Sequence, residues 1–175
     1  MREAIHRLKY KRDMALGEAL SRPMIACLDS LGWPVDMVIP VPLGVARFKE
    51  RGYNQATLLA LPIALWKGLP FRPYALSRVR ETRSQVDLNV VERKINVTGA
   101  FLARREWVVH RNILLVDDVA TTGSTLEACA AALLHAGADR VFGLTLARAH
   151  FKTGTVPGEP VKAGLVSVNQ SGSLT

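Results

Sequence analysis

The stretch ILLVDDVATTGST, residues 113–125, decides the fold of this chain. Its four leading apolar residues predict a buried strand, and its small and hydroxylated residues lead into an Ala/Leu-rich helix at residues 126–135. Gly137 ends that helix, and a second apolar strand is predicted at residues 141–147. Strand, helix and strand in this order predict a βαβ unit, the building block of a parallel sheet.

The turn within this stretch has the chemistry of a phosphate site. Ligands of open α/β sheets bind at the carboxyl ends of the strands, where unpaired N–H groups of a helix N-terminus attract anions. Gly123 allows close backbone approach, and hydroxyl donors surround it at Thr121, Thr122, Ser124 and Thr125. The preceding Asp117 and Asp118 offer acceptors for sugar hydroxyls. We therefore expect a ligand with a ribose and a 5′-phosphate, although an ordinary capped helix start uses the same residue types.

Composition and charge describe a globular chain with an acidic partner. The 175 residues suffice for one domain, and 49% of them are hydrophobic and 22% charged. Lys and Arg number 23 against 15 Asp and Glu, which gives a net charge of +8 and points to a phosphorylated small molecule or nucleic acid. The excess lies mainly in residues 61–112, which hold ten basic and four acidic side chains.

Several classes of protein are excluded. Cys27 and Cys129 lie about a hundred residues apart, so neither a zinc site nor a disulfide framework is expected. The longest apolar run, residues 56–66, contains Pro62 and is too short to span a membrane. The first residues carry charges without a following apolar stretch. We expect a cytoplasmic protein without membrane insertion.

The remaining periodicities predict further elements of an α/β domain. One or two helices are predicted at residues 3–30, with Pro23 in a first turn or at a break, and a helix at 54–66, with Asn54 as its cap or as a ligand contact and Pro62 at a kink or boundary. Strands are predicted at residues 35–41, 74–79, 97–103 and, at an edge, 161–168, and a basic loop at 43–52.

The stretch 113–125 resembles the phosphoribosyl diphosphate (PRPP) signature of type I phosphoribosyltransferases, and other segments resemble the ComF/GntX family. These segments are Ile39-Pro40-Val41-Pro42, RGYNQ at residues 51–55, residues 82–85, Arg93 with Asn96, Val97 and residues 99–101, and the helix that carries Ile5, Leu8, Lys9 and Tyr10. The resemblance covers about residues 3–149. Proteins of the ComF type usually carry an N-terminal four-cysteine zinc element, which has no counterpart in this chain.

The resemblance implies an α/β architecture of the type I phosphoribosyltransferase fold, a mostly parallel twisted sheet flanked by helices with a small hood. The domain would span residues 1–150, with hood parts at 1–34 and about 78–112, followed by a loose Gly-, Pro-, Ser- and Thr-rich tail at 151–175.

The resemblance also implies an activity and a set of site residues. Members generally transfer the phosphoribosyl unit from PRPP to a nitrogen nucleophile, with Mg²⁺ and with release of pyrophosphate. The implied PRPP-binding residues are Val116, Asp117, Asp118, Val119, Ala120, Thr121, Thr122, Gly123, Ser124 and Thr125. The implied pyrophosphate-binding residues are Pro42, Leu43, Arg47, Arg51, Arg83 and Gln85, the last two in a mobile loop. Asp117, Asp118 and Arg83 are the implied catalytic residues, and Mg²⁺ would bind mainly through PRPP, with Asp117 and Asp118 as its protein ligands.

Two readings of function stay open at this point. The first is an enzyme with an unidentified acceptor. The second is a non-catalytic module of DNA uptake, competence or use of DNA as nutrient, which senses PRPP or binds single-stranded DNA. The partners that these readings admit are PRPP, single-stranded DNA, a ComFA-like helicase and a second copy of the chain. Trp33, Trp66 and Trp107 are too scattered in the sequence to predict a base-stacking platform.

Overall fold

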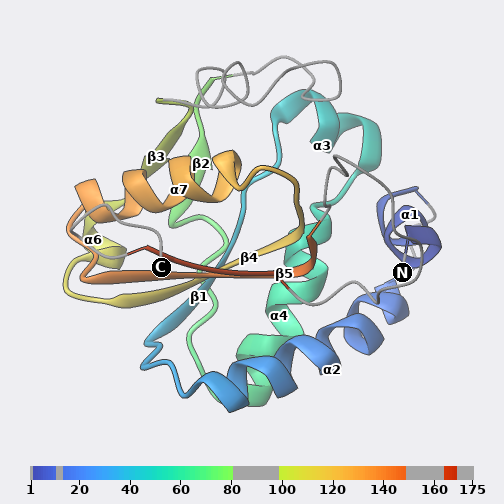
Figure 1. Ribbon diagram of the computed structural model, residues 1–175. Helices are drawn as coiled ribbons and strands as arrows, with labels where there is room; N and C mark the ends of the chain where they lie inside the picture. The colour runs from blue at the N-terminus through green and yellow to red at the C-terminus, as the bar shows by residue number, and fades with distance from the viewer. Residues whose placement is uncertain (1, 11–13, 81–98, 149–163, 169–175) are drawn as a thin grey trace, which may run out of the picture.

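The computed structural model describes residues 2–10, 14–80, 99–148 and 164–168, and the fold is given for these (Figure 1). The helices are α1 (Arg2–Tyr10), α2 (Met14–Leu31), α3 (Val45–Arg51), α4 (Gln55–Lys67), α6 (Arg105–Val108) and α7 (Ser124–His135). The strands are β1 (Met37–Pro40), β2 (Leu76–Arg78), β3 (Phe101–Ala103), β4 (Asn112–Ala120), β5 (Arg140–Arg148) and β6 (Gly164–Val168).

The central sheet has four strands in the order β1-β4-β5-β6. The first three are parallel, with Ile39 opposite Leu115 and Leu115 opposite Gly143, and β6 adds an antiparallel edge with Val168 opposite Val141. β4 and β5 are buried along almost their whole length, as expected for parallel strands that are covered on both faces. The predicted βαβ unit and the predicted edge strand are confirmed.

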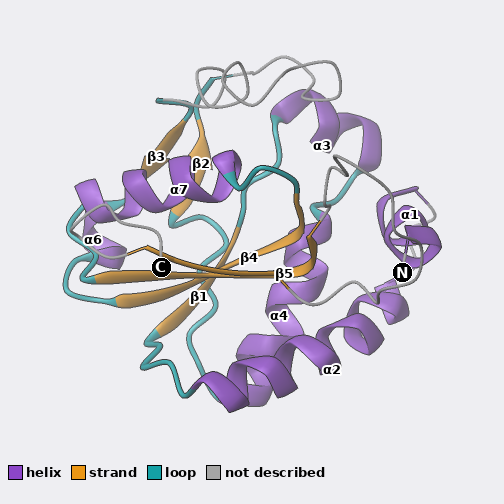
Figure 2. Cartoon of the chain, viewed as in Figure 1, coloured by secondary structure: helices purple, strands orange, loops and turns teal. Residues whose placement is uncertain are grey.

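The two faces of the sheet carry separate hydrophobic cores, because successive strand residues point to opposite sides. On one face, Leu114 and Val116 pack with side chains of α2 and α4. On the other face, Ile113 and Leu115 pack with α7, α6 and the small antiparallel sheet of β2 and β3. Figure 2 shows this layered arrangement, with α2 and α4 below the sheet and α7 above it. The chain therefore has the α/β, mostly parallel architecture that was expected.

Residues 45–51, predicted to be a basic loop, form helix α3, so that prediction is wrong. The segment VARFKER contains good helix formers and lies between two glycines that can act as end caps. Gly52 adopts a left-handed conformation (φ 78°) and donates its N–H to the carbonyl of Phe48. None of the residues of α3 is buried, so the hydrophobic pattern contained no signal for it.

Pro23 lies inside α2 rather than in a first turn or at a break, and Pro62 lies inside α4 rather than at its boundary. A proline in a helix interior costs about 3 kcal/mol, because an N–H donor is lost and the ring crowds the preceding turn. Both helices bury apolar side chains next to the proline, Met24 in α2 and Ile63 in α4. This tertiary packing keeps the helices continuous through both prolines.

Gly17 allows α2 and α4 to lie against each other. A Cβ atom at this position would lie 2.8 Å from the carbonyl oxygen of Leu58 and 2.9 Å from its Cβ. We therefore expect Gly17→Ala to lower the free energy of unfolding by about 1–3 kcal/mol, because backbone atoms of α4 must move. Chemical denaturation measures the effect, with Ala19→Ser at an exposed position of α2 as the control. A Gly17→Ala protein as stable as the control would contradict the close approach.

Candidate functional site

The turn between β4 and α7 is shaped by Gly123. This residue has φ 84° and ψ −9°, the left-handed conformation, and its carbonyl accepts the N–H of Glu127 at 2.9 Å in the first turn of α7. A Cβ atom at Gly123 would meet only Glu127 Oε1, at 3.9 Å, so space is available. The backbone angle is therefore what requires glycine here, because L side chains are strained in this region.

Hydroxyl groups and backbone amides surround a hollow of about 30 Å³ at this turn. The Oγ atoms of Thr122 and Ser124 lie 2.8 Å apart, and the N–H of Ser124 points to Thr122 Oγ1 at 3.4 Å. The residues that line the hollow are Asp117, Val119, Ala120, Thr121, Thr122, Gly123, Ser124, Thr125 and Leu126. Eight of the ten residues implied for PRPP therefore line one hollow. Val116 is instead fully buried in the hydrophobic core that the sheet forms with α2 and α4. N–H donors and hydroxyls at a helix N-terminus suit a phosphate group.

Asp117 and Asp118 are buried acidic residues near the end of β4, and only 8% and 3% of their surfaces are exposed. The strand extends to Ala120, so both lie within it and not after it as the sequence indicated. Asp118 donates its backbone N–H to Asp117 Oδ1 at 2.8 Å. The carboxylate of Asp118 contacts Lys9 Nζ at 2.6 Å and Gln55 Nε2 at 3.4 Å. Asp118 therefore has a cationic partner and an amide partner, and Asp117 faces the hollow.

Burial raises the pKa of the Asp117 carboxyl well above its ordinary value, and the negative charge of Asp118 raises it further. The thiol of Cys129, buried in α7, also has a raised pKa, first because of burial and second because of the charge of Asp117. Asp117 thus retains a proton more readily than an exposed aspartate. A carboxyl group of this kind can donate as well as accept a hydrogen bond with a bound hydroxyl group.

Helix α1 places Lys9 on Asp118 through contacts with the segment RGYNQ. Tyr53 donates its hydroxyl hydrogen to the carbonyl of Leu8 at 2.6 Å. The Arg51 guanidinium lies 5.1 Å from the ring centroid of Tyr10 and donates to Gln55 Oε1 at 2.9 Å. In Figure 1, α1 and α3 lie at the end of the sheet where β4 leads into α7. Two segments that are distant from residues 113–125 in sequence therefore complete the surroundings of the acidic pair.

Asn54 caps α4, which confirms one of the two roles predicted for it. Its Oδ1 accepts the N–H of Ala56 at 3.1 Å, and its Nδ2 donates to the carbonyl of Val41 at 2.9 Å. Gln55 and Lys9, in contrast, were not identified from the sequence as partners of Asp118. Gln55 is 63 positions from Asp118, and no local pattern links residues so far apart.

The residues implied for pyrophosphate are placed in part. Val41, just before Pro42 and Leu43, donates its N–H to the carbonyl of Val116 at 2.8 Å, so the loop after β1 begins beside the middle of β4. Arg47 is exposed on α3, and Arg51 is half-buried against Tyr10 and Gln55. Arg83 and Gln85 lie outside the described residues. The loop after β1 therefore lies at the carboxyl ends of the strands, which is the end of the sheet that carries the phosphate hollow.

The donor set is unlike that of a metal cage built by the protein alone. Among the described residues, no group of three or more His, Cys, Asp or Glu side chains could hold an ion. Asp118 contacts Lys9 and Gln55, and the pKa of Asp117 is raised by burial and by the charge of Asp118. A cation next to Asp117 and Asp118 would therefore need oxygen atoms from a bound substrate in addition to these two carboxyl groups.

No helix in the described part of the chain is long and apolar enough to cross a membrane.

Among solved structures, the fold is similar to that of glutamine phosphoribosylpyrophosphate amidotransferase from Bacillus subtilis, with a TM-score of 0.52 and 20% sequence identity. The match covers 75% of this chain and 27% of that chain. At this identity the comparison establishes the fold, which is that of the phosphoribosyltransferases.

Curated relatives define the family more narrowly, whereas no protein-family model matches the chain. The DNA utilization protein YhgH of Salmonella typhi is 38% identical over 143 residues, which cover 78% of this chain and 62% of that protein. Competence protein F of Haemophilus influenzae is 34% identical over 154 residues, which cover 83% of this chain and 66% of that protein. The chain belongs to the ComF family, and it spans about 62% of the length of the first of these relatives.

Because its pKa is raised, we expect the Asp117 side chain to destabilise the folded state by an amount that depends on pH. Because the pKa is higher in the folded state, the free energy of unfolding falls as the pH rises through it. We expect Asp117→Asn, which keeps the acceptor for the Asp118 N–H, to be more stable than the wild type by about 1–3 kcal/mol at pH 8. The gain should vanish in acid, near the ordinary aspartate pKa of 3.8.

Denaturant titrations of Asp117→Asn at several pH values check this, with Asp29→Asn, an exposed aspartate of α2, as the matched control. A gain at pH 8 in the control as well, or a gain of equal size at every pH, would contradict the role of burial.

Two lysine–aspartate pairs of equal length allow the Lys9 contact to be tested. Lys9–Asp118 and Lys67–Asp29 both have N–O distances of 2.6 Å, but Asp118 is buried and Asp29 is half exposed. We expect Lys9→Met to lower the free energy of unfolding by about 2–4 kcal/mol, because a buried carboxylate loses its cation. Lys67→Met should change it by less than about 1 kcal/mol. Equal losses in thermal or chemical unfolding would show that α1 does not hold Lys9 on Asp118.

Proposed function

We propose that this protein binds PRPP together with Mg²⁺ and transfers the phosphoribosyl unit to a nitrogen acceptor, with release of pyrophosphate. The proposal rests on one observation: at the carboxyl end of β4, the left-handed turn at Gly123 adjoins the buried pair Asp117 and Asp118. A phosphate site beside sugar-binding carboxyls matches a ribose 5-phosphate unit. The family relationship to DNA utilization and competence proteins supports a role in DNA uptake or in the use of DNA as nutrient.

The proposed binding mode follows the positions of the side chains. The 5′-phosphate would accept hydrogen bonds from the first amides of α7 and from the hydroxyls of residues 121–125. The ribose hydroxyls would reach Asp117, which lines the hollow, and Asp118, whose charge Lys9 balances. A sugar hydroxyl that donates to Asp118 would take the place of the long 3.4 Å contact from Gln55. The ribose would thereby be fixed at two points.

The chemistry would consist of positioning and charge stabilisation. The bond from ribose C1 to the pyrophosphate oxygen breaks, and its electron pair leaves with pyrophosphate. The acceptor nitrogen supplies the electron pair of the new bond and then loses a proton. Positive charge develops on the ribose ring during this exchange, close to the carboxyl groups of Asp117 and Asp118, which would stabilise it.

The charge of the leaving pyrophosphate needs cations. Neutralisation of this charge is the chemistry that a bound Mg²⁺ supplies, and the sparse protein donors fit an ion that arrives with PRPP. The loop at Pro42 and Leu43, with Arg47 and Arg51, is proposed to complete this side of the site, together with Arg83 and Gln85. The same proposal includes an unidentified nitrogen acceptor, a cytoplasmic location, a ComFA-like helicase partner and a homodimer.

A second candidate is a non-catalytic module that senses PRPP or binds single-stranded DNA. Two observations favour it: the curated relatives are named for DNA utilization and competence, and residues 61–112 carry a net charge of +6. The groups proposed for the 5′-phosphate at residues 121–125 are amides and hydroxyls, so most of this positive charge, Arg83 apart, is available for other partners.

One set of measurements separates the enzyme from the non-catalytic PRPP sensor. We expect calorimetry to show saturable binding of PRPP with Mg²⁺ at one site, and Asp117→Asn with Asp118→Asn to weaken it by at least about tenfold, since each lost charged hydrogen bond costs about 1.5–3 kcal/mol. Asp29→Asn with Asp139→Asn, which removes two exposed aspartates, is the control. Pyrophosphate release with a panel of bases and amines then tests transfer.

The outcomes of these measurements are distinct. Release that depends on one acceptor supports the enzyme, and saturable binding without release by any acceptor supports the sensor. If the wild-type protein does not bind PRPP, both the enzyme and the PRPP sensor are ruled out.

A further inference from the structure

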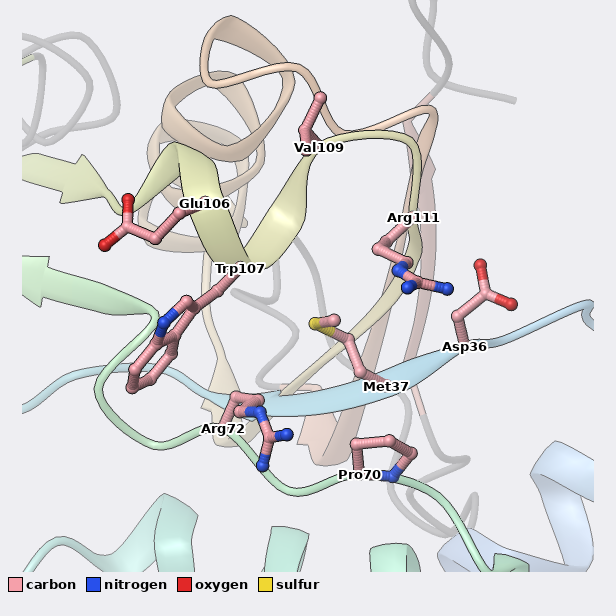
Figure 3. A pocket seen from close by; sticks show the side chains of 8 residues that line it. All are labelled: Asp36, Met37, Pro70, Arg72, Glu106, Trp107, Val109 and Arg111. Atoms are coloured by element: carbon pink, nitrogen blue, oxygen red, sulfur yellow. The ribbon is translucent and has the colours of Figure 1, made fainter.

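A second hollow, of about 510 Å³, lies at the opposite end of the sheet from the PRPP candidate site (Figure 3). Asp36 and Arg111, which line it, directly precede the first residues of β1 and β4. The nine residues of β4 separate this hollow from the turn at Gly123, and at about 3.3 Å per residue the two sites are roughly 25 Å apart. The volume is in the range of small-molecule sites, about 300–1,000 Å³. The residues proposed for PRPP do not line this hollow.

One wall of the hollow is formed by Trp107 of α6 and Arg72. The indole is half-buried, and the guanidinium Cζ atoms of Arg72 and Arg104 lie 5.9 and 5.5 Å from its ring centroid. Figure 3 shows the indole and the Arg72 side chain next to each other, with Met37 at the base of the hollow. The two guanidinium groups lie over the indole ring, and a flat heteroaromatic ring can stack on planar guanidinium groups as well as on an indole.

The facing wall holds Arg111 and Asp36, and Glu106 lies beside Trp107 (Figure 3). Asp36 is held in place because its Oδ2 accepts the N–H of Asn112 at 2.7 Å. No ion pair of the described residues involves Asp36, Arg72, Glu106 or Arg111, although all four line the same hollow. Both signs of charge are therefore available to a ligand.

This combination discriminates between ligand classes. A simple anion would use the two arginines but would be repelled by the two carboxylates, and an apolar ligand would leave four charges without partners. A nucleotide meets every feature, because its base stacks, its amino and imino groups donate to carboxylates, and its phosphate accepts from guanidinium groups.

We propose that this hollow binds a nucleotide, with its base against Trp107, the donor edge of the base toward Glu106 or Asp36, and its phosphate on Arg111 and Arg72. The nucleotide belongs either to a free mononucleotide or to single-stranded DNA, since both present the same groups. Although the three tryptophans are scattered in the sequence, the fold places one of them, Trp107, at the wall of this hollow. Trp33 instead stacks on Phe142 in the core, and Trp66 is exposed on α4.

The surroundings extend the positive charge along this end of the sheet. Arg140 begins β5 directly opposite Asn112, next to Arg111, and Arg104 and Arg105 adjoin Trp107. These three arginines are exposed. A second phosphate group bound beside the hollow would find cationic partners there, so a longer strand would gain affinity over a mononucleotide.

Binding titrations on the full chain test the nucleotide site, with four nucleoside monophosphates and a fluorescent single-stranded octanucleotide as probes. Adenosine and ribose 5-phosphate represent the base and the phosphate separately. Because a mononucleotide phosphate also suits the turn at residues 121–125, every titration is repeated in a Thr122→Val, Ser124→Ala background. The binding that persists in this background is assigned to the hollow.

We expect Trp107→Leu and Arg111→Met each to weaken nucleotide binding by at least tenfold, and Trp107→Phe to restore most of it because an aromatic face remains. Trp66→Leu and Arg22→Met, at exposed positions elsewhere, are the matched controls and should leave it unchanged. The separate base and phosphate probes should bind at least tenfold more weakly than the mononucleotide. Arg111 is exposed, so its variant keeps the test valid if Trp107→Leu fails to fold.

An octanucleotide that binds at least tenfold more tightly than every mononucleotide assigns the site to single-stranded DNA, whereas equal affinities assign it to free nucleotides. Absence of nucleotide binding in the Thr122→Val, Ser124→Ala background overturns the proposal, as does affinity that falls in Arg111→Met but not in Trp107→Leu. The proposal is independent of the PRPP site, because Asp117→Asn with Asp118→Asn should not alter this binding.

Discussion

Two carboxylates buried side by side near the end of a central strand are the constraint on which this structure depends. Asp117 and Asp118 lie in β4, which is covered by helices on both faces, and water cannot solvate them fully. The fold compensates in different ways: Lys9 and Gln55 contact Asp118, while the pKa of Asp117 is raised by burial and by its neighbour. Such an arrangement is costly for stability and is typical of sites selected for binding or chemistry.

The position of helix α1 is linked to this buried acidic pair. Helix α1 has one fully buried apolar residue, Leu8, and it is attached to the segment RGYNQ by the Tyr53 hydroxyl and by Arg51 above Tyr10. These contacts hold Lys9 at the acidic pair.

The sheet separates two regions of different chemistry. At the carboxyl ends of the strands, the groups proposed to bind an anion are backbone amides and hydroxyls around Gly123, and residues 113–125 contain no lysine or arginine. At the amino ends, the groups proposed to bind a phosphate are guanidinium groups near Trp107. Arg72 and Arg111, which line the second hollow, therefore contribute to the net charge of +8 without lining the PRPP candidate site.

The sequence by itself determined the βαβ unit, the glycine turn and the adjacent acidic pair, because these depend on local hydrophobic periodicity and on the backbone preference of Gly123. It did not predict α3, none of whose residues is buried, or the continuity of α2 through Pro23. Only the tertiary structure decided that Lys9 pairs with Asp118 and that Trp107 stands between arginines beside a hollow. The physical reason is that these contacts join segments distant in the chain, and packing brings them together, not local sequence.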